Sequence, residues 1–149
     1  MVYKFKRGSY IKADPQVAGE MLERLEAENN LTAKALVDAN RDEDAPLHNE
    51  FEWDDSVAAE AYRETLARHI INCIEIFREE AEPVRAFFSI YREKPQYQHI
   101  DTILVEKESR DALLQKALAE LNAIRRKYST LKELANVFSA IDEAEKKVG

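Results

Sequence analysis

Residues 109–141 read SRDALLQKALAELNAIRRKYSTLKELANVFSAI, and they carry the firmest structural signal in the chain. Apolar or small residues recur there at alternating intervals of three and four positions, the spacing of a coiled-coil seam. These residues are Leu114, Ala117, Leu121, Ile124, Tyr128, Leu131, Ala135 and Phe138. A second row beside the seam consists of Leu113, Leu134, Val137 and Ile141. The pattern predicts a C-terminal helical region over residues 107–147.

Two arrangements of this region fit the pattern. Thr130 and Glu133 have the spacing of a capping box, so the region can be a helical hairpin broken near Ser129, with both rows buried within one chain. A continuous helix of about 35 residues would instead be roughly 50 Å long and would leave apolar surface for a second chain. We expect a homodimer, because twofold symmetry is the commonest arrangement of identical chains. The residues expected at its interface are Leu121, Ile124, Leu131 and Phe138.

Helix start signals also occur in the first half of the chain. Asp14 followed by Pro15 is typical of a helix N-terminus, and the apolar spacing that follows predicts a helix over residues 15–28. Thr32 can cap a second, shorter helix that ends near Asn40.

The stretch APLHNEFEWDDSVAAEAYR, residues 45–63, holds the only tryptophan and a group of acids. Asp54 or Asp55 can cap a helix, and Trp53 then has the position of a hydrophobic staple over Ala58. We interpret Trp53, Asp54 and Asp55 as a structural anchor at a helix start. The helix should bury one stripe made of Ala58, Tyr62, Leu66, Ile70 and Cys73.

Strand signals are few. Residues 1–12 alternate in a way that suits a basic extended arm or a short strand, and residues 74–77 with 84–90 predict a β-hairpin. Residues 92–98 are predicted as a loop, and residues 100–108 suit either a strand or a short helix. The predicted fold is α+β and mostly α, in a single domain of residues 1–149 in which a mixed helix and hairpin region covers residues 13–106.

Composition limits the class of protein. With 45% hydrophobic residues and only seven Gly or Pro in 149 residues, the chain favours helices around one core over disorder. Cys73 is the only cysteine, so no intrachain disulfide can form. No apolar run reaches the length of a signal peptide or a membrane span. We therefore expect a cytoplasmic protein in a bacterial host cell, with no membrane contact.

The net charge of −7 is unevenly distributed. Residues 1–12 carry four bases and no acid, whereas residues 13–60 carry fourteen acids against three bases. An acidic front half repels phosphate, which disfavours nucleic acid as a partner. A nucleic-acid contact would have to use the basic start or the balanced second half.

The sequence contains only weak candidates for a metal-binding or catalytic cluster. His48 lies close to Glu50, Glu52, Asp54 and Asp55, but the spacing and turn glycine of a calcium-binding loop are missing. His69 and Cys73 are one helical turn apart, which we interpret as packing because no further soft ligand accompanies them. No glycine-rich phosphate loop exists. The sequence therefore predicts no catalytic, cofactor-binding or metal-binding residue, and no enzyme.

Four segments together resemble a group of small, uncharacterised proteins encoded by phages and prophages. They read SYIKADPQVAGEMLERL, LTAKALVDAN, APLHNEFEWDDSVAAEAYRETLARHII and RRKYSTLKELANVFSAID, and the block PLHNEFEWDDSVAAEAYR is the most specific part. The resemblance implies a bacterial or phage setting and a phage-derived gene. It implies no activity, cofactor or catalytic residue.

Two functions fit these observations. The first is a non-enzymatic interaction protein that self-associates through its C-terminal helices and binds an unknown host or phage protein. The second is a DNA-binding regulator, because helices followed by a hairpin and a dimerising helix have the element order of winged-helix proteins. Element order alone is an analogy.

Overall fold

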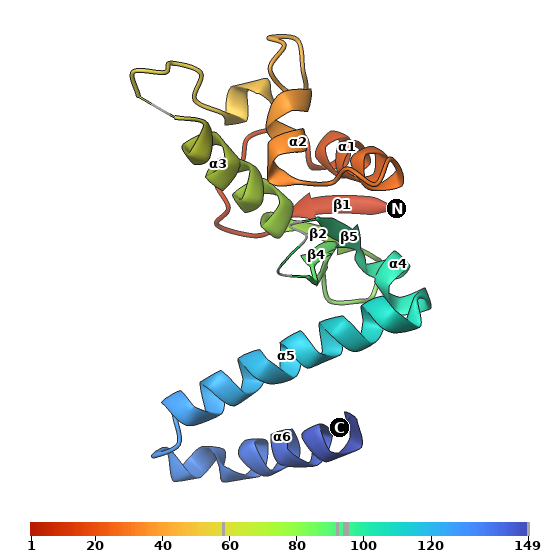
Figure 1. The fold of residues 1–149 in the computed structure, drawn as a ribbon, viewed down its shortest axis with the longest axis vertical. Coiled ribbons are helices and arrows are strands. Elements are labelled where there is room, and N and C mark those ends of the chain that lie inside the picture. Colours follow the sequence, from red (N-terminus) through yellow and green to blue (C-terminus); the bar gives the residue numbers. More distant parts are fainter. Residues whose placement is uncertain (58, 92, 94–95, 149) are drawn as a thin grey trace. The chain divides into compact units, whose positions relative to one another are not determined.

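The computed structural model describes residues 1–57, 59–91, 93 and 96–148 (Figure 1). In those residues the protein is α+β and mostly helical, with six α-helices and small antiparallel sheets, as predicted. The chain forms two compact units, Met1–Thr102 and Ile103–Gly149, called here the N-terminal and C-terminal units. The single domain predicted for residues 1–149 stays a prediction.

Two short-range capping signals were predicted correctly. Helix α1, Pro15–Ala27, begins after Asp14, whose carboxylate accepts hydrogen bonds from the backbone N–H groups of Gln16 at 2.8 Å and Val17 at 3.1 Å. Helix α2, Ala33–Ala39, begins after Thr32, whose hydroxyl accepts from the Ala35 N–H at 3.0 Å. Both caps satisfy N–H groups that have no partner within the helix.

Helix α3, Glu60–Cys73, begins later than the sequence indicates. The residue before it is Ala59, which offers no side-chain cap, so the prediction that Asp54 or Asp55 caps this helix is wrong. Asp54 closes a local turn instead, by accepting from the backbone N–H and the hydroxyl of Ser56 at 2.9 and 2.6 Å. Ala58, the expected staple partner of Trp53, lies outside the described residues.

The buried face of α3 also differs from the predicted stripe. Of the predicted stripe, Ile70 and Cys73 are buried and Leu66 packs against the core, whereas Tyr62 is 50% exposed. Arg63, Ala67 and Ile71, which were not predicted, are buried as well. The face has rotated because Arg63, which a hydrophobic pattern assigns to solvent, is held inside by its own polar partners. A short 3₁₀ helix, His48–Glu50, interrupts the loop between α2 and α3.

The first sheet has the strand order β1-β2-β3 and is antiparallel throughout. Its strands are β1 (Val2–Phe5), β2 (Ile74–Phe77) and β3 (Val84–Arg85). In its register Tyr3 pairs with Ile76, and Ile76 pairs with Val84. The predicted β2–β3 hairpin is confirmed, and the basic start of the chain is an edge strand of the same sheet.

A second sheet forms where a single strand over residues 84–90 was predicted. Strand β4, Phe87–Ser89, pairs antiparallel with β5, Tyr97–His99. Ala86 separates β3 from β4: its N–H donates to the Ile74 carbonyl at 3.1 Å and its carbonyl accepts from the Ile100 N–H at 2.8 Å. The predicted loop over residues 92–98 is therefore partly a strand, and its Arg92, Lys94 and Pro95 lie outside the described residues.

The core of the N-terminal unit lies where α1, α2 and α3 pack with the two sheets. Its largest fully buried side chains include Phe87, Leu22, Leu31, Leu36, Leu47, Ile70 and Ile71. Gly19 lies beneath the Tyr3 ring, and a Cβ atom at Gly19 would come within 3.0 Å of three atoms of that ring. The glycine in the middle of α1 is therefore what lets β1 approach this helix.

The C-terminal unit is a helical hairpin, not one continuous helix. Helix α5, Lys107–Lys127, ends near the predicted break, and α6, Ala135–Val148, returns after the short 3₁₀ helix Lys132–Leu134 (Figure 1). A short helix α4, Ile100–Val105, precedes the hairpin where the sequence left strand and helix open. None of the helices in the described ranges has the length and apolar character that a membrane span requires.

Candidate functional site

Trp53 is fixed on the loop between α2 and α3 by aromatic and cationic neighbours. Its indole stacks on the His48 ring with centroids 4.9 Å apart, and its Nε1–H donates to the His48 carbonyl at 2.8 Å. The Arg63 guanidinium lies 5.2 Å from the ring centroid, within the range of a cation–π contact. These contacts support the anchoring role predicted for Trp53, although the partners differ from the predicted staple.

Arg63 connects this loop to α3. Its Nε donates to the Glu52 carbonyl at 2.7 Å, and its two terminal nitrogens pair with Asp55 and with Glu60. A buried guanidinium needs such complete pairing, because an unpaired buried charge is strongly destabilising. Asp55 is therefore a partner of a buried arginine, a role that its position in the sequence did not indicate.

The acids around His48 are committed to the protein itself. The Glu50 carboxylate accepts from the backbone N–H groups of Lys12 and Ala13 at 2.9 and 2.6 Å, and the His48 Nδ1 lies 2.9 Å from the Asn40 carbonyl. Within the part of the chain that the structure describes, no three Asp, Glu, His or Cys residues are grouped so that they could hold a metal ion. This stretch is therefore a loop held in place by hydrogen bonds to the rest of the protein.

Cys73 and His69 approach each other, as their one-turn spacing allows. The Cys73 Sγ lies 3.6 Å from His69 Nδ1, and the other ring nitrogen of His69 contacts the Ser9 carbonyl at 2.9 Å. Burial raises the pKa of the Cys73 thiol, so the thiol stays protonated near neutral pH. A nucleophilic cysteine requires the opposite shift.

Sequence reasoning missed a buried polar network at the start of α4. The Tyr3 hydroxyl donates to the Glu23 carboxylate and lies 3.2 Å from His99 Nε2, while the His99 Nδ1 accepts from the Asp101 N–H at 3.1 Å. These bonds place the ring proton of His99 on Nε2. The Glu26 carboxylate also accepts from the His99 N–H at 2.7 Å. The network joins β1, α1, β5 and α4, and its members are too far apart in the sequence for any spacing rule to reveal it.

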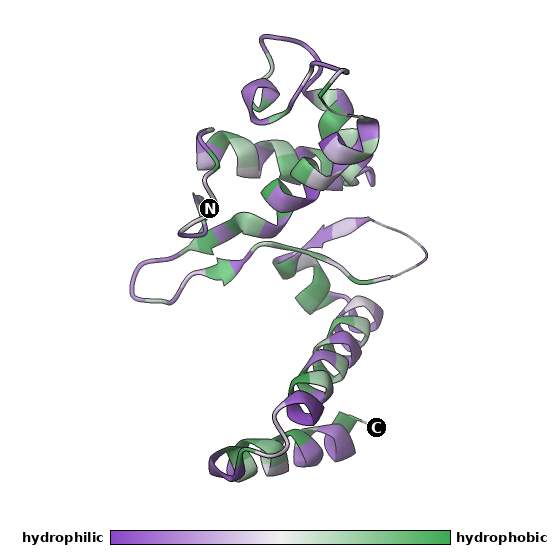
Figure 2. Cartoon of the chain, turned by 90° about the vertical axis from the view of Figure 1, so that its left-hand side faces the viewer, coloured by the Kyte–Doolittle hydropathy of each residue, from purple (hydrophilic) through white to green (hydrophobic). Residues whose placement is uncertain are grey.

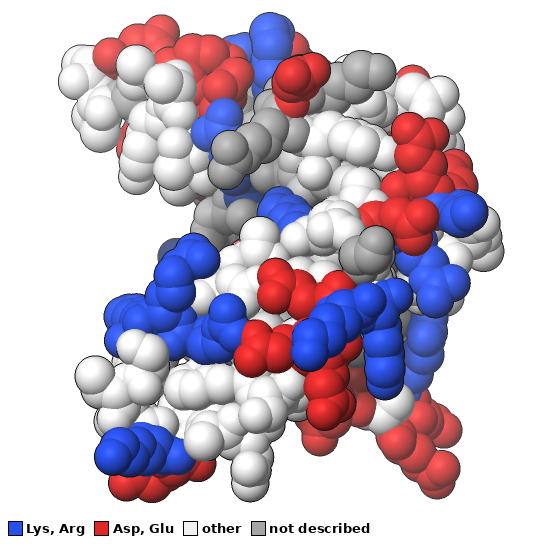
Figure 3. All heavy atoms as spheres, turned by 60° about the horizontal axis from the view of Figure 1, so that its bottom comes forward, with Lys and Arg blue, Asp and Glu red and all other residues white. Residues whose placement is uncertain are grey.

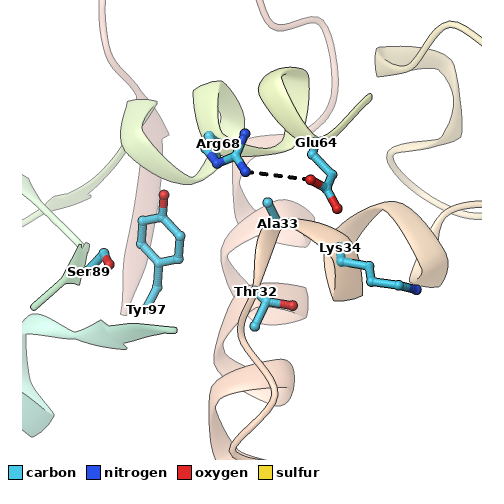
Figure 4. Close-up of a pocket in the computed structure, with 7 residues that line it drawn as sticks. All are labelled: Thr32, Ala33, Lys34, Glu64, Arg68, Ser89 and Tyr97. Carbon is cyan, nitrogen blue, oxygen red and sulfur yellow. Dashed lines mark ion pairs between the residues drawn. The ribbon is translucent and has the colours of Figure 1, made fainter. Parts of the chain in front are cut away.

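The N-terminal unit has an open cleft of about 230 Å³ between α2, α3 and the second sheet (Figure 4). Its lining consists of Thr32, Ala33, Lys34, Glu64, Arg68, Ser89 and Tyr97. Both cations of this lining, Lys34 and Arg68, have acidic neighbours. Lys34 pairs with Asp38 at 2.6 Å, and Arg68 lies 3.5 Å from Glu64 one turn before it on α3.

Tyr97 forms one wall of this cleft. Its backbone N–H donates to the Leu31 carbonyl at 2.8 Å, which fixes β5 against the loop between α1 and α2. Its side chain is 7% exposed, and burial raises the pKa of the phenol, with Arg68 and Arg85 acting in the opposite direction. The hydroxyl is therefore a neutral O–H donor at physiological pH. No sequence signal marked it, since the residue falls in a predicted loop.

The residues expected at a dimer interface lie on the surface of the C-terminal hairpin. Leu121, Ile124 and Leu131 are 40%, 50% and 46% exposed, and Phe138 is half-buried. The hairpin is closed by other residues, mainly Leu118 and Ile141 with an ion pair between Arg125 and Asp142. The structure thus separates the contacts that close the hairpin from the predicted seam.

Comparison with known proteins adds no assignment to this geometry: no protein-family model, no curated protein and no solved structure matches the chain.

Proposed function

We propose that the chain is a non-enzymatic protein-interaction protein of phage or prophage origin, which self-associates through its C-terminal hairpin. The observation that carries the proposal is the exposed apolar seam on α5 and on the turn that follows it. Five of the eight seam residues, Leu114, Leu121, Ile124, Tyr128 and Leu131, are large and at least 39% exposed.

The seam is exposed because α5 contacts α6 with a different face. Leu118 and Asn122, one turn apart, are buried, whereas Leu121 and Ile124 lie beside them on the open side. Figure 2 shows hydrophobic and hydrophilic positions alternating along both helices of the hairpin. A helix with apolar residues on two flanks requires burial on both. A two-helix hairpin can supply only one.

A second copy of the hairpin is the occupant that fits this surface. Along α5, from Leu114 to Ile124, the alternating three and four spacing keeps one stripe in register with a partner helix. Two helical hairpins packed together make a four-helix bundle. Twofold symmetry would bring the seam of one chain onto the seam of the other. A partner protein of the host or phage would then bind elsewhere on the chain.

The alternative function, a winged-helix DNA-binding regulator, has less support. A helix-turn-helix joins its helices through a turn of three or four residues, whereas residues 40–59 separate α2 from α3. On α3, Arg63 is buried and committed to acidic partners, so it does not face a phosphate backbone. The basic residues visible in Figure 3 lie among acidic ones.

Light scattering across a concentration series tests self-association. We expect the parent chain to have twice the monomer mass at about 100 μM, and Leu121→Glu and Ile124→Glu to be monomeric with unchanged circular dichroism. Ala123→Glu is the matched control, because it places the same charge on an exposed position of α5 outside the seam. A parent chain that stays monomeric at this concentration would refute the proposal, as would a control that dissociates the dimer equally.

A further inference from the structure

Tyr10 combines high exposure with a strained backbone. Its side chain is 92% exposed, the largest fraction among the large hydrophobic side chains that the structure describes. Its φ of 59° lies in the left-handed region, which a bulky residue enters only at a cost in free energy. The fold requires neither property, because the ring is almost fully open to solvent and a glycine would adopt the same backbone without strain. A residue that is strained and exposed in this way points to a function.

The loop that presents Tyr10 is fixed to the end of α3. In Figure 1 the chain that follows β1 runs past this end of the helix. The Lys6 N–H donates to the Cys73 carbonyl at 2.7 Å, and the Ser9 carbonyl lies 2.9 Å from Nε2 of His69. The loop is therefore already ordered, so a ligand that contacts the Tyr10 ring does not have to pay for ordering its backbone.

Three cations lie on the same loop as Tyr10. They are Lys6, Arg7 and Lys12, and all three are exposed. None of their side chains forms an ion pair with a described residue. The acid that contacts this loop, Glu50, accepts from backbone N–H groups and not from these side chains. The loop therefore presents three positive charges that an anionic partner can use.

The described turns of α3 around His69 add no acid to this surface. The residues three and four positions from His69, which share its face of the helix, are Thr65, Leu66, Asn72 and Cys73. Arg85 on β3 donates to the Asn72 side chain, which brings a further cation to the end of α3. Glu75 on β2 lies between Lys4 and Arg85 in the sheet register, so two cations offset its charge.

We propose that the loop of residues 6–12 binds single-stranded nucleic acid, with a base stacked on the Tyr10 ring and backbone phosphates held by Lys6, Arg7 and Lys12. Aromatic rings that stack on bases, together with cations that follow the backbone, are the means by which single strands are bound without sequence preference. A duplex keeps its base faces stacked inside, so it offers no face to an exposed ring. An acidic protein segment offers carboxylates to the cations but no base to the ring. This contact also differs from that of a winged helix, because no helix enters a groove.

Fluorescence anisotropy with the full-length chain and a labelled oligo(dT) of about 12 nucleotides tests the proposal. We expect saturable binding with a Kd of roughly 10 to 100 μM in about 50 mM salt, the range of sequence-independent contacts. Each phosphate contact on a single strand contributes a slope of about −0.7 to the dependence of log K on log salt, so three cations predict a slope of about −2. An oligo(U) of the same length distinguishes RNA from DNA as the source of the strand.

Variants separate stacking from charge. Tyr10→Ala should weaken binding at least about fivefold with an unchanged salt slope, whereas Tyr10→Phe, which keeps the ring, should bind like the parent. Arg7→Gln should make the salt slope shallower by about 0.7. Arg24→Gln is the matched control, since it removes an exposed cation of α1 outside the loop and should leave the slope unchanged. Circular dichroism shows that each variant remains folded, as expected for exposed side chains.

Three results would overturn the proposal: no saturable binding at low salt, equal affinities of Tyr10→Ala and the parent, or equal affinities for the single strand and a duplex of the same length. Displacement of the oligonucleotide by polyglutamate at an equal concentration of charge would also overturn it, and would indicate an acidic protein as the partner. The loop belongs to the N-terminal unit, whereas self-association concerns the C-terminal hairpin. Loss of binding in Tyr10→Ala should leave the molecular mass unchanged, so each proposal can fail without the other.

Discussion

At the scale of single residues, Trp53 is the side chain in the loop before α3 whose removal should lower the free energy of unfolding most. Trp53→Ala removes the stack on His48, the hydrogen bond to the His48 carbonyl and the surface that covers Arg63. We expect the free energy of unfolding to fall by about 2 to 3 kcal/mol, less than for a fully buried tryptophan. Chemical denaturation measures the change. Trp53→Phe, which keeps an aromatic ring, should lose less, and an alanine variant as stable as the parent would contradict the anchoring role.

For Gly19→Ala we expect a change in the free energy of unfolding that is opposite in sign to the change that helix propensity predicts. In an exposed helix, glycine to alanine stabilises by about 1 kcal/mol. Here the added methyl group would overlap the buried Tyr3 ring, so we expect Gly19→Ala to destabilise the protein by about 2 kcal/mol. Denaturant melts of Gly19→Ala, Tyr3→Leu and the double variant check the cause. If the clash is responsible, the two losses will sum to more than the loss in the double variant.

Asp14 and Asp54 allow the contribution of a helix cap to stability to be compared with that of a local turn. Asp14 caps α1 through two backbone N–H groups, whereas the exposed Asp54 only closes a turn with Ser56. We expect Asp14→Ala to lower the free energy of unfolding by about 1 kcal/mol and Asp54→Ala to change it by less than about 0.5 kcal/mol. Equal losses measured by denaturant unfolding would restore Asp54 to the capping role that the sequence suggested.

At the scale of elements, the correct predictions depended on neighbours close in the sequence. Asp14 and Thr32 cap helices within three positions of themselves, and β2 and β3 are joined by a short turn. The break at Ala86 was missed because its two backbone bonds go to Ile74 and Ile100, which no local pattern connects. Alternation of apolar residues continued through this position and concealed the change of sheet.

The late start of α3 has a similar cause. Acidic residues at positions 54 and 55 favour a helix start by local rules, but Asp55 instead pairs with Arg63, which lies in the first turn of α3. Burial of an arginine is not visible in a hydrophobic pattern.

In the hairpin formed by α5 and α6, one prediction from the sequence is correct and another is wrong. The break predicted near Ser129 is where the chain reverses, since α5 ends at Lys127, but the predicted capping box of Thr130 and Glu133 is wrong, because the 3₁₀ helix that follows has Leu131 before it and no side-chain cap. The seam spacing did not identify the residues that close the hairpin, because Leu118 and Asn122 lie one position away from seam residues. Homodimerisation through the exposed seam stays a prediction, and the mass measurement proposed above addresses it.

At the scale of the whole molecule, the free energy of unfolding at alkaline pH should depend on the raised pKa values of the buried tyrosines. Burial raises the pKa of Tyr97 above the value near 10 of an unfolded chain, and the pKa of Tyr3 is raised by burial and by its hydrogen bond to Glu23. The folded protein therefore holds these protons more tightly than the unfolded chain. The stability from this difference is fully present below about pH 10 and is lost as the pH rises through the folded pKa values.

We expect the free energy of unfolding to fall above about pH 10 by up to about 1.4 kcal/mol per pH unit for each retained proton. Tyr97→Phe should make this fall less steep, because it removes one phenol whose pKa burial raises in the folded protein. Tyr62→Phe is the matched control on the exposed side of α3 and should leave the slope unchanged. Denaturant unfolding at a series of pH values between neutrality and about pH 11 measures the slopes. Identical slopes in Tyr97→Phe and the parent would mean that the phenol ionises as readily in the folded protein as in the unfolded chain, and that the cleft does not keep its hydroxyl as a donor.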